Sequence, residues 1–383
     1  MRIFQVLATW ATSGFTEGRT WLRNLHEPLI DLGHEVSLFL ADEGWIAMYR
    51  KDKAMRASFS QKMVEKFRRE HNIRPFDSFF AYLMDGMVEP DVIDEIRRTG
   101  IPTLNFSCNN THQFHLIKEL SPRFDYNLHS EKDAAQKFRE INANPVWFPM
   151  AANPKYYHPY DVLRTIDVSF VGQCYAKRPY YVWHLLKNKI DIHVYGPGWV
   201  PKSDKAMLRS GVRWARRTKL VLKALTSLSS QKRYETSTHL MDIDLRDYLR
   251  KEFKANLHDT ISDDEMVRKY SQSKVSLGFL EVFDNHNPAA LTKQHLHLRE
   301  FEAPMSGALY CTGYTDELAE MYEPDKEVLV YRNEYELTDK VRFYLSHPEQ
   351  AERVRQAGHR RALENHTYQS RFQKLFCQLN LDI

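Results

Sequence analysis

The chain has 383 residues, 43% of them hydrophobic and 13% aromatic, which is enough for two cores and excludes a globally disordered protein. It carries 54 Lys and Arg against 50 Asp and Glu, so the formal charge of +4 does not require a polyanionic partner such as a nucleic acid. The four cysteines lie far apart without a CxxC pair, which argues against a zinc site and a disulfide framework.

The chain begins directly with a strand-like stretch and lacks the layout of a signal peptide. Its apolar runs fall short of the roughly 18 residues that a membrane span needs. We therefore expect a cytoplasmic protein, either free or attached to the inner face of the membrane.

The first part of the chain alternates strands and helices. A strand at Arg2 to Ala8, a helix from about Thr16 to Leu32 that stops at Gly33, and a strand at His34 to Ala41 form a βαβ unit. Further strands are expected at 76–83, 101–107, 124–129 and 146–151, with helices at 89–99 and 131–141 and a charged, solvated helix at 51–71. This alternation predicts an open parallel sheet with helices on both faces.

Prolines and tyrosines at Asn153 to Pro159 interrupt this rhythm and predict a linker. The pattern then restarts. Strands are expected at 168–172, 190–195, 274–280, 308–311 and 327–330, and helices at 178–187, 263–271, 299–306, 334–345, 348–363 and 367–379. The sequence therefore predicts two doubly wound α/β domains in tandem.

An insertion near 201–250 contains a basic amphipathic helix at 207–228. Its apolar face is formed by Met207, Gly211, Trp214, Thr218, Val221, Leu225 and Leu228, and its basic face by Arg209, Arg213, Arg216 and Lys223. Two interpretations are open: a surface helix with a solvated basic face, or a helix that docks on an anionic membrane or holds a lipid-linked acceptor.

Ligands of open α/β sheets bind beyond the carboxyl ends of the strands. In the second domain, Gly172 ends a strand, and Lys177 and Arg178 begin the next helix. This arrangement suits a pyrophosphate, although solvated basic residues at a helix start explain it equally.

Two further strand ends carry candidates in this domain. Gly196 and Trp199 belong to a tight loop that either frames a flat base or holds a packed tryptophan. Asn285 and His286 suit sugar hydroxyls or phosphate, or simply a solvated loop.

The helix that begins at Arg299 and halts at Gly307 is the strongest candidate. Arg299 could pair with a phosphate, and Glu302 could accept both hydroxyls of a ribose. Their i,i+3 spacing also fits an intrahelical salt bridge.

In the first domain the strand ends offer Ser13, Gly14 and Asn109 as candidate ligand-binding residues. Asp85 and His112 are the acid/base candidates. The alternative is structural, with Asn and Thr capping a helix at 112–120.

The usual motifs of dinucleotide sites, P-loops, zinc proteases and serine hydrolases are missing from the sequence. A pyrophosphate-plus-ribose set without a metal motif points to metal-free chemistry on a nucleotide-linked substrate.

A more specific pattern runs from Ile261 to Phe376. It comprises Arg299, Phe301, Glu302, Gly307, Thr312, Glu317-Leu318, His347-Pro348, His366-Thr367-Tyr368 and Arg371. This combination resembles the GT-B glycosyltransferases, specifically the CgeB-like (spore-maturation-type) branch of the family-1-type sugar transferases. Weaker parallels, including GHEV at 33–36 and VYGPGW at 194–199, extend the resemblance over most of the chain.

The resemblance implies two Rossmann-like domains facing a cleft: an acceptor domain at 1–155, a donor domain at 156–364, and a helix at 365–383 that crosses back. It implies that Glu302 holds the ribose of a UDP- or GDP-linked sugar and that Arg299, Lys177 and Arg178 are phosphate candidates. No metal and no cofactor besides the donor is implied. Gln294 stands where many retaining relatives carry a second glutamate, which leaves open whether the reaction retains or inverts the sugar configuration.

We therefore expect a glycosyltransferase that moves a hexose-type sugar from a nucleotide donor to a glycan, lipid-linked or protein acceptor. The alternatives are a nucleotide-sugar epimerase of the same fold and a non-catalytic carbohydrate- or nucleotide-binding scaffold.

Overall fold

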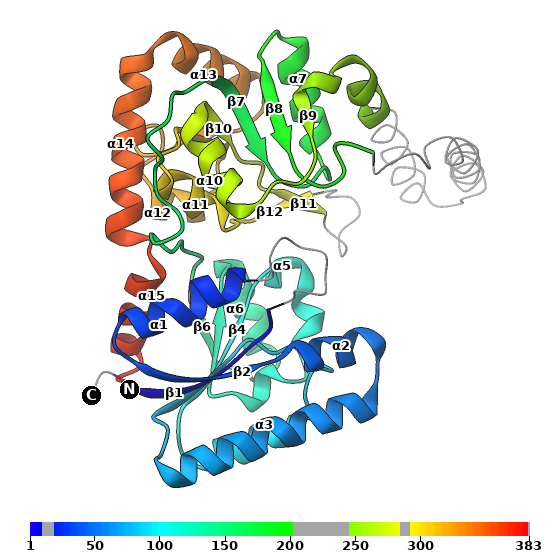
Figure 1. Ribbon diagram of the computed structural model, residues 1–383, viewed down its shortest axis with the longest axis vertical. Helices are drawn as coiled ribbons and strands as arrows, with labels where there is room; N and C mark the ends of the chain where they lie inside the picture. Colours follow the sequence, from blue (N-terminus) through cyan, green and yellow to red (C-terminus); the bar gives the residue numbers. More distant parts are fainter. Residues whose placement is uncertain (10–18, 202–244, 284–291, 382–383) are drawn as a thin grey trace, which may run out of the picture. The chain divides into compact units, whose positions relative to one another are not determined.

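The structure is a computed structural model that describes residues 1–9, 19–201, 245–283 and 292–381 (Figure 1). The chain divides into two compact units. Unit 1 comprises Met1–Tyr156 and Ala362–Ile383, and unit 2 comprises Tyr157–Arg361.

Unit 1 is built on a parallel six-stranded sheet of order β2-β1-β3-β4-β5-β6. The strands are β1 (Arg2–Leu7), β2 (Glu35–Leu40), β3 (Ser78–Ala81), β4 (Thr103–Ser107), β5 (Tyr126–His129) and β6 (Pro145–Trp147). The helices include a π-helix at Leu22–His26, α1 (Glu27–Asp31), α2 (Asp42–Arg50), α3 (Lys53–Ile73), α4 (Pro90–Arg97), α5 (Asn110–Gln113), α6 (Ala135–Arg139) and α15 (Tyr368–Gln378). The sequence did not predict α2.

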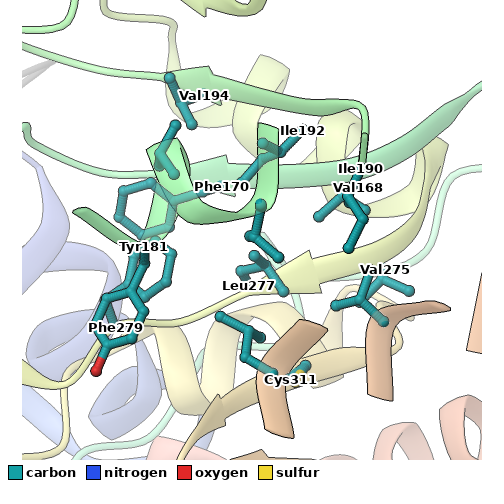
Figure 2. Close-up of a cluster of buried hydrophobic side chains, with 14 of the residues drawn as sticks. Val168, Phe170, Tyr181, Ile190, Ile192, Val194, Val275, Leu277, Phe279 and Cys311 are labelled. Carbon is teal, nitrogen blue, oxygen red and sulfur yellow. The ribbon is translucent and has the colours of Figure 1, made fainter. Parts of the chain in front are cut away.

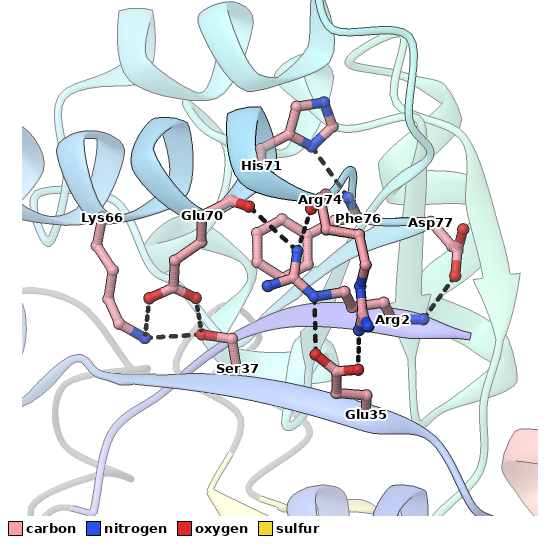
Figure 3. A network of polar contacts seen from close by, with 9 residues as sticks. All are labelled: Arg2, Glu35, Ser37, Lys66, Glu70, His71, Arg74, Phe76 and Asp77. Atoms are coloured by element: carbon pink, nitrogen blue, oxygen red, sulfur yellow. Dashed lines mark hydrogen bonds and ion pairs between the residues drawn. The ribbon is translucent and has the colours of Figure 1, made fainter.

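Helix α3 is more than the solvated cover that its charge predicts. Phe59, Met63 and Phe67 are buried on one face, where Phe67 meets Phe4 of β1 edge-on at 5.4 Å between ring centroids. Figure 3 shows the polar contacts at the far end of the helix. Glu70 accepts a hydrogen bond from Ser37 of β2 at 2.6 Å, and Arg2 of β1 donates from Nη1 to the carbonyl of Glu70 at 3.2 Å. The helix is therefore fixed to β1 and β2 by both apolar and charged contacts.

Helix α15 packs within unit 1, although it follows unit 2 in the sequence. The Phe372 ring lies 5.7 Å from Phe80 of β3 and 5.3 Å from Phe148, which follows β6. Thr367 forms a β-bridge with Ala152 and caps the helix through Ser370 N. These contacts make the last helix part of the unit 1 core.

Unit 2 repeats the architecture with a parallel sheet of order β14-β13-β10-β7-β8-β9. The strands are β7 (Ile166–Val171), β8 (Ile192–Tyr195), β9 (Leu257–His258), β10 (Ser273–Leu277), β13 (Tyr310–Gly313) and β14 (Leu329–Tyr331), and β11 (Glu281–Phe283) pairs with β12 (Thr292–Gln294) as a hairpin. The helices include α7 (Arg178–Lys187), α10 (Asp263–Gln272), α11 (Arg299–Met305), α12 (Asp316–Met321), α13 (Glu334–Ser346) and α14 (Pro348–Asn365). The predicted class, two doubly wound α/β sheets, is confirmed.

The core of unit 2 lies between the sheet and its helices (Figure 2). Val168 and Phe170 of β7 and Leu277 of β10 are fully buried, as expected for a strand covered on both faces. Tyr181 of α7 stacks on Phe279 at 5.2 Å between ring centroids. Phe279 follows β10 directly, so this stacking sets the position of α7 over the carboxyl end of the sheet.

Candidate functional site

The sheet of unit 2 reverses its winding between β7 and β10. The chain passes from β7 to β8 on one side and from β10 to β13 on the other. A crevice for ligands forms at the carboxyl ends of two such strands. Gly172 follows β7 at this point, and Gly278 and Phe279 follow β10.

Two loops approach each other closely at Gly172. A Cβ atom on Gly196, whose φ is +142°, would lie 2.6 Å from the carbonyl oxygen of Gly172. The same oxygen accepts a hydrogen bond from Trp199 Nε1 at 2.7 Å. Only glycine fits at position 196, because a side chain would clash with backbone and favour a different φ.

Arg178 is positioned at this crevice by the start of α7. It is only 2% exposed, and its Nη1 donates to the carbonyl of Gln173 at 3.1 Å and its Nη2 to that of Phe279 at 3.3 Å. Its Nε is buried without a hydrogen-bond partner among the described residues. Burial first, and then the positive charge of Arg299, lowers the pKa of Arg178 to about 10.

Arg299, the first residue of α11, lies beside Arg178. Each guanidinium carbon is 5.4 Å from the centroid of the Phe170 ring. A Cβ atom on Gly172 would lie 2.9 Å from Arg299 Nη2, so the arginine covers the end of β7. Arg299 Nη1 is buried and makes no hydrogen bond within the described part of the chain. Two cations with unused donors, held together at the end of a strand, form a site for an anion.

The structure does not contain the salt bridge that the i,i+3 spacing allowed. Across the described ranges, no ion pair joins Arg299 to Glu302. Although burial acts to lower the pKa of Arg299, the surrounding Tyr270, Tyr310, Glu300 and Glu302 raise it above its ordinary value. Arg299 is therefore fully charged.

Glu302 lies on the same helix in a different environment. The residue is 6% exposed, and its carboxyl group receives a hydrogen bond from Tyr157. Burial raises its pKa to about 7, against the opposing effects of Tyr157 and Arg299. Glu302 is thus a carboxylate with spare acceptor capacity, poised to change its ionisation near neutral pH.

Glu300 was not predicted as part of the site. It is fully buried and accepts hydrogen bonds from the Tyr310 hydroxyl at 2.7 Å and from the backbone N–H of His297 at 2.5 Å. Although burial raises its pKa, His297, Arg299 and Tyr310 lower it below the ordinary value. In the sequence, Glu300 is one of several charged residues on a predicted helix. Its buried position could be recognised only from the folded structure, in which β13 places Tyr310 beside it.

Helix α11 ends as predicted. Gly307 adopts a left-handed φ of +73°, and a Cβ atom there would lie 2.9 Å from the ring of Pro159. Tyr157 and Pro159, from the start of unit 2, therefore both pack against α11.

The remaining donor-site candidates are placed less favourably. Lys177 is exposed to solvent at the N-cap of α7, and the described contacts do not bring it to the arginine pair. Trp199 is 1% exposed and packs edge-on against Phe170, which corresponds to the packed tryptophan of the two interpretations. Asn285 and His286 lie outside the described residues, as do Ser13, Gly14 and the basic helix 207–228.

The candidates in unit 1 follow β3 and β4 in the sequence. Asp85 accepts hydrogen bonds from the backbone N–H groups of Glu119 and Leu120, both at 3.0 Å, while burial raises its pKa. The helix expected at 112–120 is instead α5 followed by a 3₁₀ turn at Phe114–Leu116, and His112 lies in α5.

Asn109 is left-handed, with a φ of +60°, and its side chain makes no capping hydrogen bond. The expected Asn and Thr caps are therefore wrong. The N-terminus of α5 is capped by Glu131, which accepts from Asn110 N at 2.7 Å and was not predicted. A carboxylate satisfies the free N–H groups there better than an uncharged side chain does.

Within the described ranges, no group of three or more His, Cys, Asp or Glu side chains is gathered as a metal site. None of the described helices is long and apolar enough to cross a membrane.

A family profile described as "Glycosyl transferase-like" matches residues 181–376, just over half of the chain. The match includes α11 with Arg299 and Glu302, whereas Arg178 lies just before the matched range. A comparison with curated proteins gives no match.

Solved structures similar to the chain include a glycosyltransferase from Rickettsia africae, with 10% identity, a TM-score of 0.61, and coverage of 99% of this chain and 98% of that one. Sucrose-phosphate synthase from Thermosynechococcus elongatus matches with 11% identity, a TM-score of 0.59 and 99% coverage of both chains. HepE from Anabaena, solved in complex with UDP, matches with 9% identity, a TM-score of 0.57, and coverage of 99% of this chain and all of that one. At these identities, the likeness concerns the fold.

Proposed function

The chain belongs to the glycosyl transferase-like family and has the GT-B fold, and from this premise we propose that the arginine site of unit 2 binds the diphosphate of a nucleotide sugar. The observation that carries the proposal is the pair Arg178, which is buried, and Arg299, which is partly buried, each with a buried donor atom unused in the described structure, at the carboxyl end of β7. A diphosphate supplies the charge and the acceptors that this pair lacks.

In this proposal Glu302 accepts the hydroxyls of the ribose. A carboxylate can accept two hydroxyl hydrogens, and one of its oxygens remains for a ligand beside Tyr157. HepE from Anabaena, which has a similar fold, has been solved with UDP and with UDP-glucose.

The reaction that follows is transfer of a hexose-type sugar from a UDP- or GDP-linked donor to an acceptor. When the bond between the sugar and the diphosphate breaks, the leaving phosphate gains a negative charge. Arg178 and Arg299 lie where they would stabilise that charge. We propose that they do so without a bound metal, which predicts that EDTA leaves turnover unchanged.

The finer assignments are proposals as well. We place the donor in unit 2 and the acceptor, which is a glycan, a lipid-linked molecule or a protein, at unit 1. We assign the chain to the CgeB-like branch because of the motif formed by Arg299, Glu302 and Gly307. Asp85, His112 and Asn109 remain the acceptor-side candidates.

Isothermal titration with UDP-, GDP- and dTDP-sugars tests the proposal. We expect saturable binding of one nucleotide class and a roughly 10- to 100-fold loss in Arg299→Met, because a hydrogen bond to a charged group contributes about 1.5–3 kcal/mol. Arg353→Met, which alters an exposed arginine on α14, is the matched control and should bind normally. Equal affinity in both variants would refute the site.

Turnover then separates the reaction classes. A transferase releases free nucleoside diphosphate only when an acceptor is present, whereas an epimerase of this fold does not depend on an acceptor. A scaffold would keep its partner in Glu302→Ala, while a transferase would lose donor affinity.

A further inference from the structure

His297 lies two residues before Arg299 with its side chain 18% exposed, and the proposed function gives it no role. It lies between β12 and α11, and its Nδ1 is 3.6 Å from Glu300 Oε2. Both ring nitrogens are buried atoms, and neither makes a hydrogen bond within the described ranges. One edge of the ring therefore faces a carboxylate, while the other edge offers an unused polar atom.

Glu300 is built to hold this ring. The carboxylate is anchored by Tyr310 at 2.7 Å and accepts the backbone N–H of His297 itself at 2.5 Å. It is held in its ionised form, as described above, so it orients the ring and favours a proton on Nδ1.

The arginine pair has the opposite effect on His297. Burial is the largest influence and lowers the pKa of the imidazole, Glu300 raises it, and Arg178 and Arg299 lower it further. Both arginines are therefore within electrostatic reach of the ring. In the empty site His297 is neutral at neutral pH.

We propose that His297, oriented by Glu300, is a third contact for the donor's diphosphate, and that its ring takes up a proton from solvent when the diphosphate binds. This inference rests on the proposed function and extends it to a residue that neither the family match nor the sequence pattern singled out.

The physical reason is charge balance. A bound diphosphate ester brings two negative charges beside two arginines and so reverses the local potential that kept the imidazole neutral. Protonated His297 then donates Nδ1–H toward Glu300 and Nε2–H toward the phosphate. When the bond from the sugar to the phosphate breaks, its electron pair stays on the leaving phosphate, and the imidazolium adds to the charge that stabilises it.

The other ionisable groups around the ring behave differently. Glu302 of α11, with a pKa of about 7, must lose a proton to accept ribose hydroxyls well, so its effect on affinity has the opposite pH dependence. Burial raises the pKa values of Tyr270 on α10 and Tyr310 on β13 well above neutrality. Arg178 on α7 and Arg299 stay charged below pH 9, as the directions of their pKa shifts show. The ring of His295 also packs against His297, with 4.3 Å between the ring centroids. His295→Gln on the Glu302→Gln background must therefore keep the proton uptake if His297 is its source.

The test is calorimetric titration of the full chain with UDP-glucose, and with GDP-mannose as a second probe, between about pH 5.5 and 8.5 in buffers of different ionisation enthalpy. The diphosphates of these probes do not themselves titrate in that range. In Glu302→Gln, which removes the competing proton, we expect proton uptake on binding and an affinity that falls by up to tenfold per pH unit as the pH rises.

His297→Gln is the decisive variant, because its amide nitrogen can occupy the place of Nε2 but cannot take up a proton. Added to Glu302→Gln, it should abolish both the proton uptake and the fall in affinity with rising pH. His359→Gln is the matched control, since His359 lies in the same unit with Nδ1 3.3 Å from the carbonyl of Pro304. It should leave both unchanged.

Two negative results have different meanings. If neither probe nor any other nucleotide sugar binds the unaltered chain, the proposed function fails and this inference fails with it. If a probe binds but proton uptake is missing in Glu302→Gln, or survives His297→Gln, only the role of His297 is overturned. If His297→Gln does not fold, His297→Asn on the same background gives the same comparison.

Discussion

Replacing Glu302 by glutamine should stabilise the empty protein at high pH and weaken donor binding at the same time. Burial raises the pKa of Glu302 from 4.5 to about 7. Since one pKa unit corresponds to about 1.4 kcal/mol, keeping this group ionised costs the folded state about 3 kcal/mol. The folded pKa is the higher one, so the protonated group stabilises the fold below pH 4.5, and that contribution is lost as the pH rises toward 7.

Urea denaturation at about pH 5 and about pH 8 measures this difference. The free energy of unfolding of Glu302→Gln, relative to the unaltered chain, should increase by about 2–3 kcal/mol between the two pH values. Other titrating groups cancel in the comparison, because both proteins carry them. Binding of the nucleotide sugar at pH 8 should fall roughly tenfold, because a neutral amide replaces a charged acceptor.

Glu300→Gln is the matched control two residues away. The pKa of Glu300 is lowered in the folded state, so its ionised form stabilises the fold above the unfolded pKa and that contribution is lost on acidification. Glu300→Gln should therefore destabilise the protein at pH 8, whereas Glu302→Gln should not. A common sign for both variants would refute the distinct environments assigned to the two carboxylates.

Three further predictions concern the surroundings of the site. Gly196→Ala should lower the free energy of unfolding by about 1–3 kcal/mol and weaken donor binding, because the new Cβ would lie 2.6 Å from the carbonyl oxygen of Gly172. The control Gly33→Ala meets open space and should cost about 1 kcal/mol without affecting binding. Equal losses of stability in urea denaturation would contradict the close approach at Gly196. Tyr157→Phe should raise the pKa of Glu302, because the substitution removes a hydrogen bond that lowers this pKa. The pH at which donor affinity rises should therefore move to a higher value. An unchanged pH profile of donor affinity would exclude the contact between Tyr157 and Glu302. Vesicles rich in anionic lipid should co-sediment the chain, and reversing the charges of Arg213, Arg216 and Arg217 should abolish this, while unaltered sedimentation would remove the membrane hypothesis for the basic helix.

Local sequence signals predicted the scaffold of the site well. Helix α7 has the predicted bounds, because Pro179 at its start and the apolar positions Val182 and Leu185 mark one helical face. The stop at Gly307 was equally readable, since a left-handed residue ends a helix. From these features the sequence places Arg178 and Arg299 at strand ends of the same sheet.

The chemistry around these residues was harder to predict because it depends on contacts between distant segments. Trp199 looked equally suited to hold a base or to fill a core, and only its contact with Phe170 decides this. In the sequence, Glu131 is simply the first residue of a predicted helix. In the structure it follows β5 and caps α5 in place of the expected asparagine. The i,i+3 spacing along one helix suggested a salt bridge between Arg299 and Glu302. In the folded protein, Tyr270 and Tyr310 from other elements also surround Arg299.

The arginine site is difficult to explain by stability alone. Two neighbouring like charges, one buried and one partly buried, repel each other, and replacing buried charges by apolar residues of similar size often stabilises a protein. Arg178 and Arg299 each keep a buried donor without a partner in the described structure, and Glu302 has a pKa that makes its ionised form costly. A ligand that combines a diphosphate with vicinal hydroxyls would satisfy all three groups at once. Under the proposed function, a nucleotide sugar is the ligand that would satisfy these groups together.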